Sequence, residues 1–383
     1  MDFDLTDEQR LMQDSVGRLM ADAYGSLEQR NRHRAEPLGW SEQLWARYAE
    51  LGLLGLPFSE QHGGFGGGPQ ELMLVMEAFG RALAVEPYFS TVVLGGALLR
   101  LAGSPAQQSA LISRIAEGKL RLAFAHAEPQ ARYDLYDVAT TAHRAGSGWV
   151  LDGEKTLVLH GDSADLLIVS ARTAGERTDA EGISLFLLDA ATRGVMRRGY
   201  PTQDGLRAAE VSLSGAPAGE DAVLGKPGAA APVIAQAVDL ALAALCAEAV
   251  GAMEALHALT VDYLKTRKQF GVPIGSFQVL QHRAVDMMIA LEQARSMTMY
   301  AAMMADSADA EERRAAIAAA KVQVNRSARF LGQQAIQLHG GIGMTMEYKA
   351  GHYFKRLAMM ESLFGDTEHH LRAVAQHGHL IGD

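Results

Sequence analysis

The sequence predicts an α+β protein in three parts, with helical segments at both ends and a β-domain between them. Apolar residues recur at helical spacing up to about residue 118. Short β-type runs separated by turn residues fill 119–228, and long helical stretches rich in Ala and Met occupy 229–383. A chain of 383 residues, 48% of them hydrophobic, exceeds one ordinary core, so several domains are expected.

The N-terminal segment is expected to be helical. Thr6 and Gln9 have the N-cap chemistry of a first helix, and apolar periodicity predicts further helices over 40–54 and 71–84. The glycine run at 63–68 interrupts this pattern. No Lys-Ser/Thr pair follows the run, so it indicates a flexible turn more strongly than a phosphate-binding loop.

The middle segment is expected to form a small β-barrel or sandwich. Its apolar residues cluster in short runs, and turn pairs such as Asp152-Gly153 and Asp204-Gly205 separate these runs. The expected strands lie at 120–125, 149–151, 166–170, 183–188 and 211–213.

The C-terminal segment is expected to form an antiparallel four-helix bundle. Long helices separated by short loops are expected at 232–266, 277–306 and 309–339. The most apolar stretch, 229–253, contains Asp239 and Glu248. These charges favour a helix inside the bundle over a membrane span.

Composition argues against several classes of function. The net charge of −10 and the pI of about 5.7 argue against a nucleic-acid partner, which requires a clustered basic face. The single cysteine, Cys246, cannot form an internal disulfide and lies in an apolar stretch, which indicates a buried thiol in a reducing compartment. The N-terminus lacks the basic and apolar regions of a signal peptide, so a cytoplasmic protein is expected.

Three C-terminal segments contain residues suited to binding a ligand. They are 267–278, with Arg267, Phe270 and Gln278; 337–343, with Gln337, Gly340 and Gly341; and 364–370, with Asp366 and Thr367. An arginine at a helix end can bind a diphosphate, and clustered glycines let the backbone approach a ligand closely. Each segment also has a structural interpretation, respectively as a helix C-terminal charge, a C-cap and an N-cap.

The order and spacing of these segments resemble the acyl-CoA dehydrogenase family. The family pattern is Arg-x-x-Phe-Gly, then Gln-x-x-Gly-Gly, then a Tyr-Glu-Gly-Thr-like segment near the end. Leu54-Gly55-Leu56-Pro57, Glu128-Pro129, Gly153-Glu154-Lys155 and Ala171-Arg172-Thr173 also resemble the family. The likeness therefore covers essentially the whole chain.

This resemblance implies a helical–β–helical fold and FAD-dependent α,β-dehydrogenation of an acyl-CoA thioester. In the family, a carboxylate removes the substrate's α-proton and the β-hydrogen passes as hydride to the flavin. One subunit holds the flavin ring with its β-domain and last segment, while its neighbour holds the ADP half. By position, the cofactor-binding residues of this chain would be Arg267, Phe270, Gln278, Gln337, Gly340 and Gly341 on the ADP side, and Thr367 in the last segment.

The ring side departs from the family pattern. The family's Thr-Glu-Pro and Gly-Ser-Asp correspond to 127–134, where a hydroxyl is lost and Arg132-Tyr133 replaces Gly-Ser. The family's Trp-Ile-Thr, which packs against the flavin and hydrogen-bonds it, becomes Leu157-Val158-Leu159. Leucine cannot donate a hydrogen bond to a flavin oxygen or nitrogen.

The catalytic base departs from the pattern as well. Gly365 occupies the usual Glu position in the last segment. Ala241, followed by Leu242, occupies the alternative Glu position on the first helix of the bundle. Asp366 is the nearest carboxylate, one residue later and one methylene shorter, and it is the remaining candidate for the base.

These departures are similar to the small subunits of two-gene acyl-CoA dehydrogenases, such as the pimeloyl-CoA and steroid-degrading pairs. The similarity implies an α2β2 assembly with a second acyl-CoA dehydrogenase chain, electron-transfer flavoprotein as acceptor, and a place in fatty-acid or steroid catabolism. Two alternatives stay open: a non-catalytic subunit that completes the partner's FAD site, and a self-sufficient homo-oligomer that uses Asp366. The sequence does not indicate the acyl group.

Histidine pairs near the C-terminus, His369-His370 and His377-Gly378-His379, have the chemistry of metal ligands. No third or fourth ligand accompanies them, so solvent-exposed histidines without a metal are expected.

Overall fold

The structure, a computed structural model, describes residues 5–378. Its contacts divide the chain into two compact units. The helical unit comprises Met1–Arg32, Gly68–Ala84 and Leu242–Asp383, and the β-unit comprises His33–Gly67 and Val85–Ala241. Each unit therefore contains segments that are far apart in the sequence.

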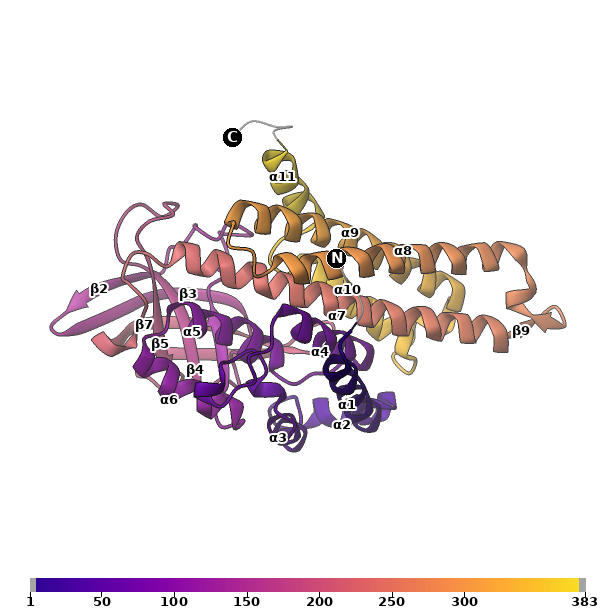
Figure 1. Cartoon of the computed structure of the whole chain (residues 1–383), viewed down its shortest axis with the longest axis horizontal. Helices are drawn as coiled ribbons and strands as arrows, with labels where there is room; N and C mark the ends of the chain where they lie inside the picture. Colours follow the sequence, from indigo (N-terminus) through magenta and orange to yellow (C-terminus); the bar gives the residue numbers. More distant parts are fainter. Residues whose placement is uncertain (1–4, 379–383) are drawn as a thin grey trace. The chain divides into compact units, whose positions relative to one another are not determined.

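The β-unit is built around one mainly antiparallel eight-stranded sheet (Figure 1). The strands follow the order β6-β7-β3-β2-β4-β5-β8, and β1 pairs in parallel with β4. Leu151, Val169 and Phe186 belong to the buried apolar cluster on this sheet. The strands are β1 (Leu122–Ala125), β2 (Thr141–Ala145), β3 (Gly148–Leu159), β4 (Leu166–Arg172), β5 (Ile183–Asp189), β6 (Val195–Pro201), β7 (Arg207–Gly219) and β8 (Val223–Leu224).

Short helices complete the β-unit. They are α3 (Glu42–Glu50), η1 (Leu53–Gly55), η2 (Glu60–His62), η3 (Phe89–Gly95), α5 (Gly96–Ala102), α6 (Pro105–Ala116) and η4 (Glu220–Ala222). The hydroxyl of Ser41 caps α3 by accepting a hydrogen bond from the Leu44 amide at 3.4 Å. Gly52, at φ 74°, follows the end of α3, so the helix expected over 40–54 is shorter than the apolar pattern suggests.

The helical unit contains the long helices of the chain, and α7, α8 and α9 run side by side (Figure 1). Its elements are α1 (Asp7–Tyr24), α4 (Pro69–Ala82), α8 (Gln278–Met304), α9 (Ala310–His339), η6 (Gly340–Met344), α10 (Lys349–Ser362) and α11 (Thr367–His377), with β9 (Lys268–Gln269), β10 (Val272–Pro273) and η5 (Ile274–Ser276) between α7 and α8. Helix α7 (Ala231–Thr266) begins in the β-unit range, and α2 (Leu27–Ala35) spans the boundary at residue 32. The capping box expected at Thr6 and Gln9 is present at the start of α1.

The expected α+β class, with helices before and after a β-structured middle, is confirmed. Strands β2 and β6 were not expected, because their residues are mostly exposed and lack the apolar alternation of a half-buried strand. They join the sheet through pairing with β3 and β7 instead. Tertiary pairing therefore creates strands that local pattern does not reveal.

Helix α7 is long and apolar enough to cross a membrane by length and composition alone. However, 83% of its most apolar window is buried inside the protein. This burial is typical of a core helix, as the sequence predicts for this segment.

Candidate functional site

The first ADP-side segment, 267–278, begins where α7 ends and the chain turns back through a hairpin. Phe270 and Gly271 form the tip with φ values of 52° and 81°, which is typical of a two-residue type I′ turn. The Ile274 amide donates to the Arg267 carbonyl at 2.8 Å and closes the base of this hairpin. The turn chemistry therefore sets the positions of Arg267 and Phe270 relative to each other.

Aromatic contacts bring the second ADP-side segment, 337–343, to the same end of the helical unit. The ring centroid of His339, in the last turn of α9, lies 4.6 Å from that of Tyr263 in the last turn of α7 and 5.1 Å from that of Tyr348. A Cβ built on Gly340 or Gly341 would meet nothing within 4 Å. The two segments are thus neighbours, with open space over the glycines.

The ADP-side side chains face outward. Arg267, Gln278 and Gln337 are exposed, and Phe270 is 91% exposed, in edge-to-face contact with Phe277 at 6.1 Å between centroids. An exposed guanidinium at a helix end and a pair of exposed glycines suit a diphosphate, and an exposed aromatic ring suits a nucleobase. The residues present therefore fit the ADP half of a dinucleotide.

The ring-side segments, 127–134 and 157–159, lie in the β-unit. A bulge in β3 places Leu157 at φ 49°, a left-handed value that is costly for a branched side chain. Leu157 and Leu159 are half-buried, and the neighbouring Thr156 amide donates to the carbonyl of Ala127 at 2.8 Å. The two ring-side segments are therefore side by side, but the leucines do not fit the hydrogen-bonding groups of a flavin ring.

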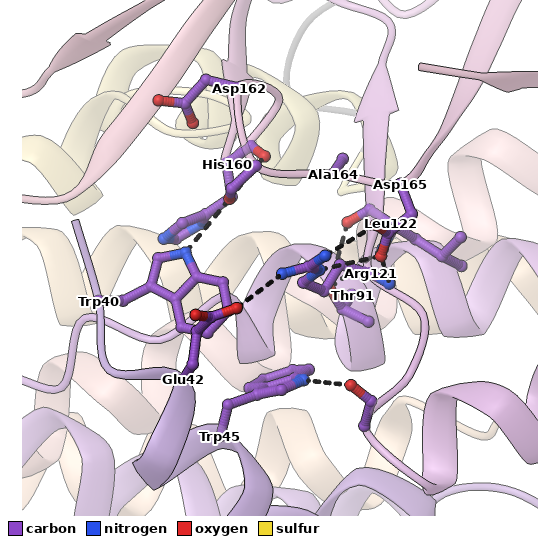
Figure 2. Close-up of polar contacts among 12 residues, drawn as sticks. Trp40, Glu42, Trp45, Thr91, Arg121, Leu122, His160, Asp162, Ala164 and Asp165 are labelled. Atoms are coloured by element: carbon purple, nitrogen blue, oxygen red, sulfur yellow. Dashed lines mark hydrogen bonds and ion pairs between the residues drawn. The ribbon is translucent and has the colours of Figure 1, made fainter. Parts of the chain in front are cut away.

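Polar contacts anchor the loop that follows these leucines (Figure 2). The Trp40 indole donates to the Ser163 hydroxyl at 3.2 Å. The Arg121 guanidinium donates two hydrogen bonds to Asp165, at 2.7 and 2.9 Å, and lies 5.6 Å from the centroid of the Trp40 ring. Two parallel hydrogen bonds are the strong, directional form of an arginine–carboxylate contact. The loop is held in place by the β-unit itself.

A buried ion pair fixes the other ring-side segment. The Lys155 ammonium lies 2.6 Å from Glu128 and 3.0 Å from the Ser170 hydroxyl, and Glu128 also accepts the amides of Ala139 and Thr140 at 2.7 and 3.0 Å. Burial alone would raise the pKa of Glu128, but the charge and hydrogen bond of Lys155 lower it to about 2. Burial lowers the pKa of Lys155 to about 8. The pair ties both ends of the 128–140 loop to β3.

Neither expected base position offers a carboxylate. Gly365 is buried, with a φ of 118° that side chains rarely adopt. Ala241 and Leu242 are buried within α7. Both positions are therefore buried and carry no ionisable side chain.

Asp366 is the N-cap of α11. Its carboxylate accepts a hydrogen bond from the His369 amide at 2.9 Å, and the side chain is half-buried. Thr367 is the first residue of α11, and its hydroxyl donates to Glu361 at 3.3 Å. This segment therefore starts a helix, as its structural interpretation predicts. If Asp366 acted as a base, the same carboxylate would also have to cap α11.

The histidine pairs differ in part from the expectation. His370 is only 4% exposed, so the expectation that it faces solvent is wrong. Helix α11 packs against α9, and Lys321 of α9 is close enough to lower the pKa of His370. His377 is exposed, and His379 lies outside the described residues. Among residues 5–378, no group of three or more His, Cys, Asp or Glu side chains is arranged to hold a metal ion.

Sequence reasoning missed the buried lysines. Lys321 on α9 donates to the Met360 carbonyl at 2.6 Å and to the Asn325 side chain at 2.9 Å, and burial lowers its pKa to about 8. Lys155 stands in the sequence as part of the family-like segment Gly153-Glu154-Lys155, which does not reveal its burial. A single lysine within an apolar run was the one available signal, and an exposed lysine in an amphipathic element gives the same signal.

Sequence models of three acyl-CoA dehydrogenase regions match the chain: the N-terminal domain at residues 6–119, the middle domain at 123–214 and the C-terminal domain at 231–379. The probable acyl-CoA dehydrogenase YngJ of Bacillus subtilis is 30% identical over 96% of this chain and 97% of its own length. The ChsE4-ChsE5 complex from Mycobacterium tuberculosis contains a chain with a TM-score of 0.89 and 25% identity, with complete coverage of both chains. The FAD complex of PigA matches with a TM-score of 0.90 and 27% identity, again with complete coverage.

Proposed function

This chain belongs to the acyl-CoA dehydrogenase family of FAD-dependent oxidoreductases, and on that premise we propose that it works as the second subunit of a heteromeric acyl-CoA dehydrogenase. One observation supports this proposal above the others. The ADP-side residues form an exposed surface, while Gly365, at the usual base position, is buried in a conformation suited to glycine. A chain with half a cofactor site and no base at its usual place is suited to completing another chain's active site.

On the ADP side, this chain's own residues would bind and orient the cofactor. Arg267 would hold the diphosphate, Phe270 would cover the adenine, and the backbone at Gly340 and Gly341 would approach the phosphates closely. When bound, FAD supplies the acceptor for the substrate's β-hydrogen as hydride. The partner chain would supply the carboxylate that removes the α-proton.

On the ring side, Leu157 and Leu159 present apolar surface where the family hydrogen-bonds the flavin. We propose that this chain holds no flavin ring of its own. The α2β2 assembly, electron-transfer flavoprotein as acceptor and a cytoplasmic location belong to the same proposal. The likeness of this chain to a chain of the ChsE4-ChsE5 complex supports the heteromer.

The direct test expresses this chain alone, saturates it with FAD and assays a panel of acyl-CoAs with an artificial electron acceptor. We expect turnover lower by about 10²–10⁴-fold than in the assembled enzyme, because losing a general base has this typical cost. Adding the partner chain should restore activity.

Asp366→Asn is the matched variant for this test. Asparagine caps a helix as well as aspartate does, so α11 keeps its N-cap while the candidate base is removed. Brisk turnover of the lone chain that disappears in Asp366→Asn would overturn the proposal and identify Asp366 as the base.

A second prediction concerns flavin retention. Replacing Arg267 with alanine removes a charge-assisted contact to the diphosphate, so the assembled complex should lose about 10-fold or more in FAD affinity. The flavin-to-protein ratio after gel filtration of the complex measures this loss.

Lys265→Ala is the control for Arg267→Ala. Lys265 is also exposed and lies in the last turn of α7, so it carries the same favourable charge at the helix C-terminus. If the Arg267→Ala and Lys265→Ala complexes retain the same flavin-to-protein ratio, that result would contradict a diphosphate contact at Arg267. It would support the interpretation of Arg267 as a helix C-terminal charge.

A further inference from the structure

We propose that the imidazole of His370 fills the space beside Gly365, so that only glycine fits at the position where the family places its catalytic base. The identification of position 365 as the usual base position rests on the proposed function, whereas the contact between His370 and Gly365 does not. It is a feature of the helical unit alone, between the turn before α11 and the first turns of that helix.

The geometry at position 365 excludes a side chain in two ways. Gly365 has a φ of 118°, which strains any L side chain. A Cβ built there would also lie 2.5 Å from Nε2 of His370 and 2.6 Å from Cδ2 of His369, well inside van der Waals contact. The imidazole of His370 therefore occupies the space in which a side chain at position 365 would begin.

His370 is held in this place. His370 is 4% exposed, and a backbone hydrogen bond with Phe364, the residue before Gly365, raises the pKa of the ring against the larger effect of burial. His369 is half-buried, whereas His370 is buried, and the two rings lie edge-to-face with centroids 5.1 Å apart. Of the two contacts, the one with His370 is the harder to relieve.

The charge state of the ring agrees with this role. Burial, with the nearby Lys321 ammonium, lowers the pKa of His370 to about 3, so the ring is neutral at physiological pH. Nε2 has no hydrogen-bond partner among the described residues, and it is the atom that a Cβ at position 365 would approach most closely. So weak a base is poorly suited to remove a substrate proton, which leaves steric closure as the role of this side chain.

A double-mutant cycle tests the contact by thermal unfolding of the full chain. Gly365→Ala should lower the Tm by roughly 5–10 °C through backbone strain and the clash. His370→Ala removes the clashing ring, so the double variant should unfold at a Tm above the additive sum by about half of the Gly365→Ala loss.

Gly63→Ala is the matched control. Gly63 has a φ of 81°, but a Cβ there would meet nothing within 4 Å, so this substitution carries backbone strain without a clash. Its effect should add to that of His370→Ala without coupling.

Each outcome decides the proposal. If Gly365→Ala alone does not fold, a folded double variant supports closure by His370. Additive effects at positions 365 and 370, or a double variant that does not fold, contradict it. These outcomes are independent of turnover by the unmodified chain, which tests the proposed function separately.

Discussion

Replacing Gly80 or Gly251 with alanine should lower the free energy of unfolding by about 3 kcal/mol or more in each case. Helices α4 and α7 touch through their backbones at these two glycines. A Cβ on Gly80 would lie 1.9 Å from the carbonyl oxygen of Glu248, and a Cβ on Gly251 would lie 1.9 Å from that of Glu77. Backbone atoms inside helices cannot move aside locally, so the two helices would have to separate.

Separating the helices would also disturb the ion pairs beside the contact. Arg81 on α4 lies 2.7 Å from Glu254 on α7, and Arg295 on α8 lies 3.4 Å from the same carboxylate. Both arginines also reach Glu77, at 3.2 and 3.5 Å. The loss on Gly80→Ala should therefore include part of this network.

Gly17→Ala is the control for these substitutions. Gly17 lies inside α1, and a Cβ there would meet nothing within 4 Å. Alanine in an open helix interior stabilises by up to about 1 kcal/mol relative to glycine, so the sign of the effect should reverse. Urea unfolding measures all three variants, and a neutral or stabilising Gly80→Ala would contradict the close approach of α4 and α7.

Lys155→Met should cost roughly 3–5 kcal/mol, because it leaves the Glu128 carboxylate buried without its counter-charge. Both side chains are essentially inaccessible to solvent. Arg144→Met is the matched control, since the Arg144–Glu220 pair lies in the same unit but both side chains are more than half exposed. That exposed pair should contribute less than about 1 kcal/mol.

The Glu128–Lys155 pair also predicts a pH dependence. The folded state lowers the pKa of Glu128 from its ordinary 4.5 to about 2, so the ionised carboxylate stabilises the fold above pH 4.5. That contribution is lost as pH falls from 4.5 toward 2. In Glu128→Gln the contribution is absent at every pH, so the stability difference from the unmodified chain should shrink over this window. Urea unfolding at pH 7, 4.5 and 3 measures it, and a constant difference would contradict the assigned pKa.

The local signals in the sequence were sufficient for the class and order of the elements. Helical periodicity over 232–266, 277–306 and 309–339 corresponds closely to α7, α8 and α9. Strands β3 and β7 extend far beyond the apolar runs at 149–151 and 211–213, because pairing between them recruits polar residues. Periodicity reports burial on one face of an element, and it does not report where pairing ends.

The residues of the candidate site also fall into those that local sequence reveals and those that only packing reveals. Arg267, Phe270 and the glycines at 340–341 could be selected from the sequence, because a helix end, a turn and a glycine cluster are local chemistry. The absence of a carboxylate at Gly365 could also be read directly. The burial of His370 could not, because it depends on how α11 packs against α9.

By itself, the sequence determined the α+β class and the helical–β–helical order, and it supplied the candidate ADP-side residues and the glycine at the expected base position. Only the tertiary structure decided that Lys155 pairs with Glu128, that Gly80 meets α7, and that the ring of His370 lies against Gly365. The physical reason is that hydrophobic period and turn chemistry are properties of neighbouring residues. A buried ion pair, a backbone contact between helices and a side chain packed against a glycine each depend on atoms that only folding brings together.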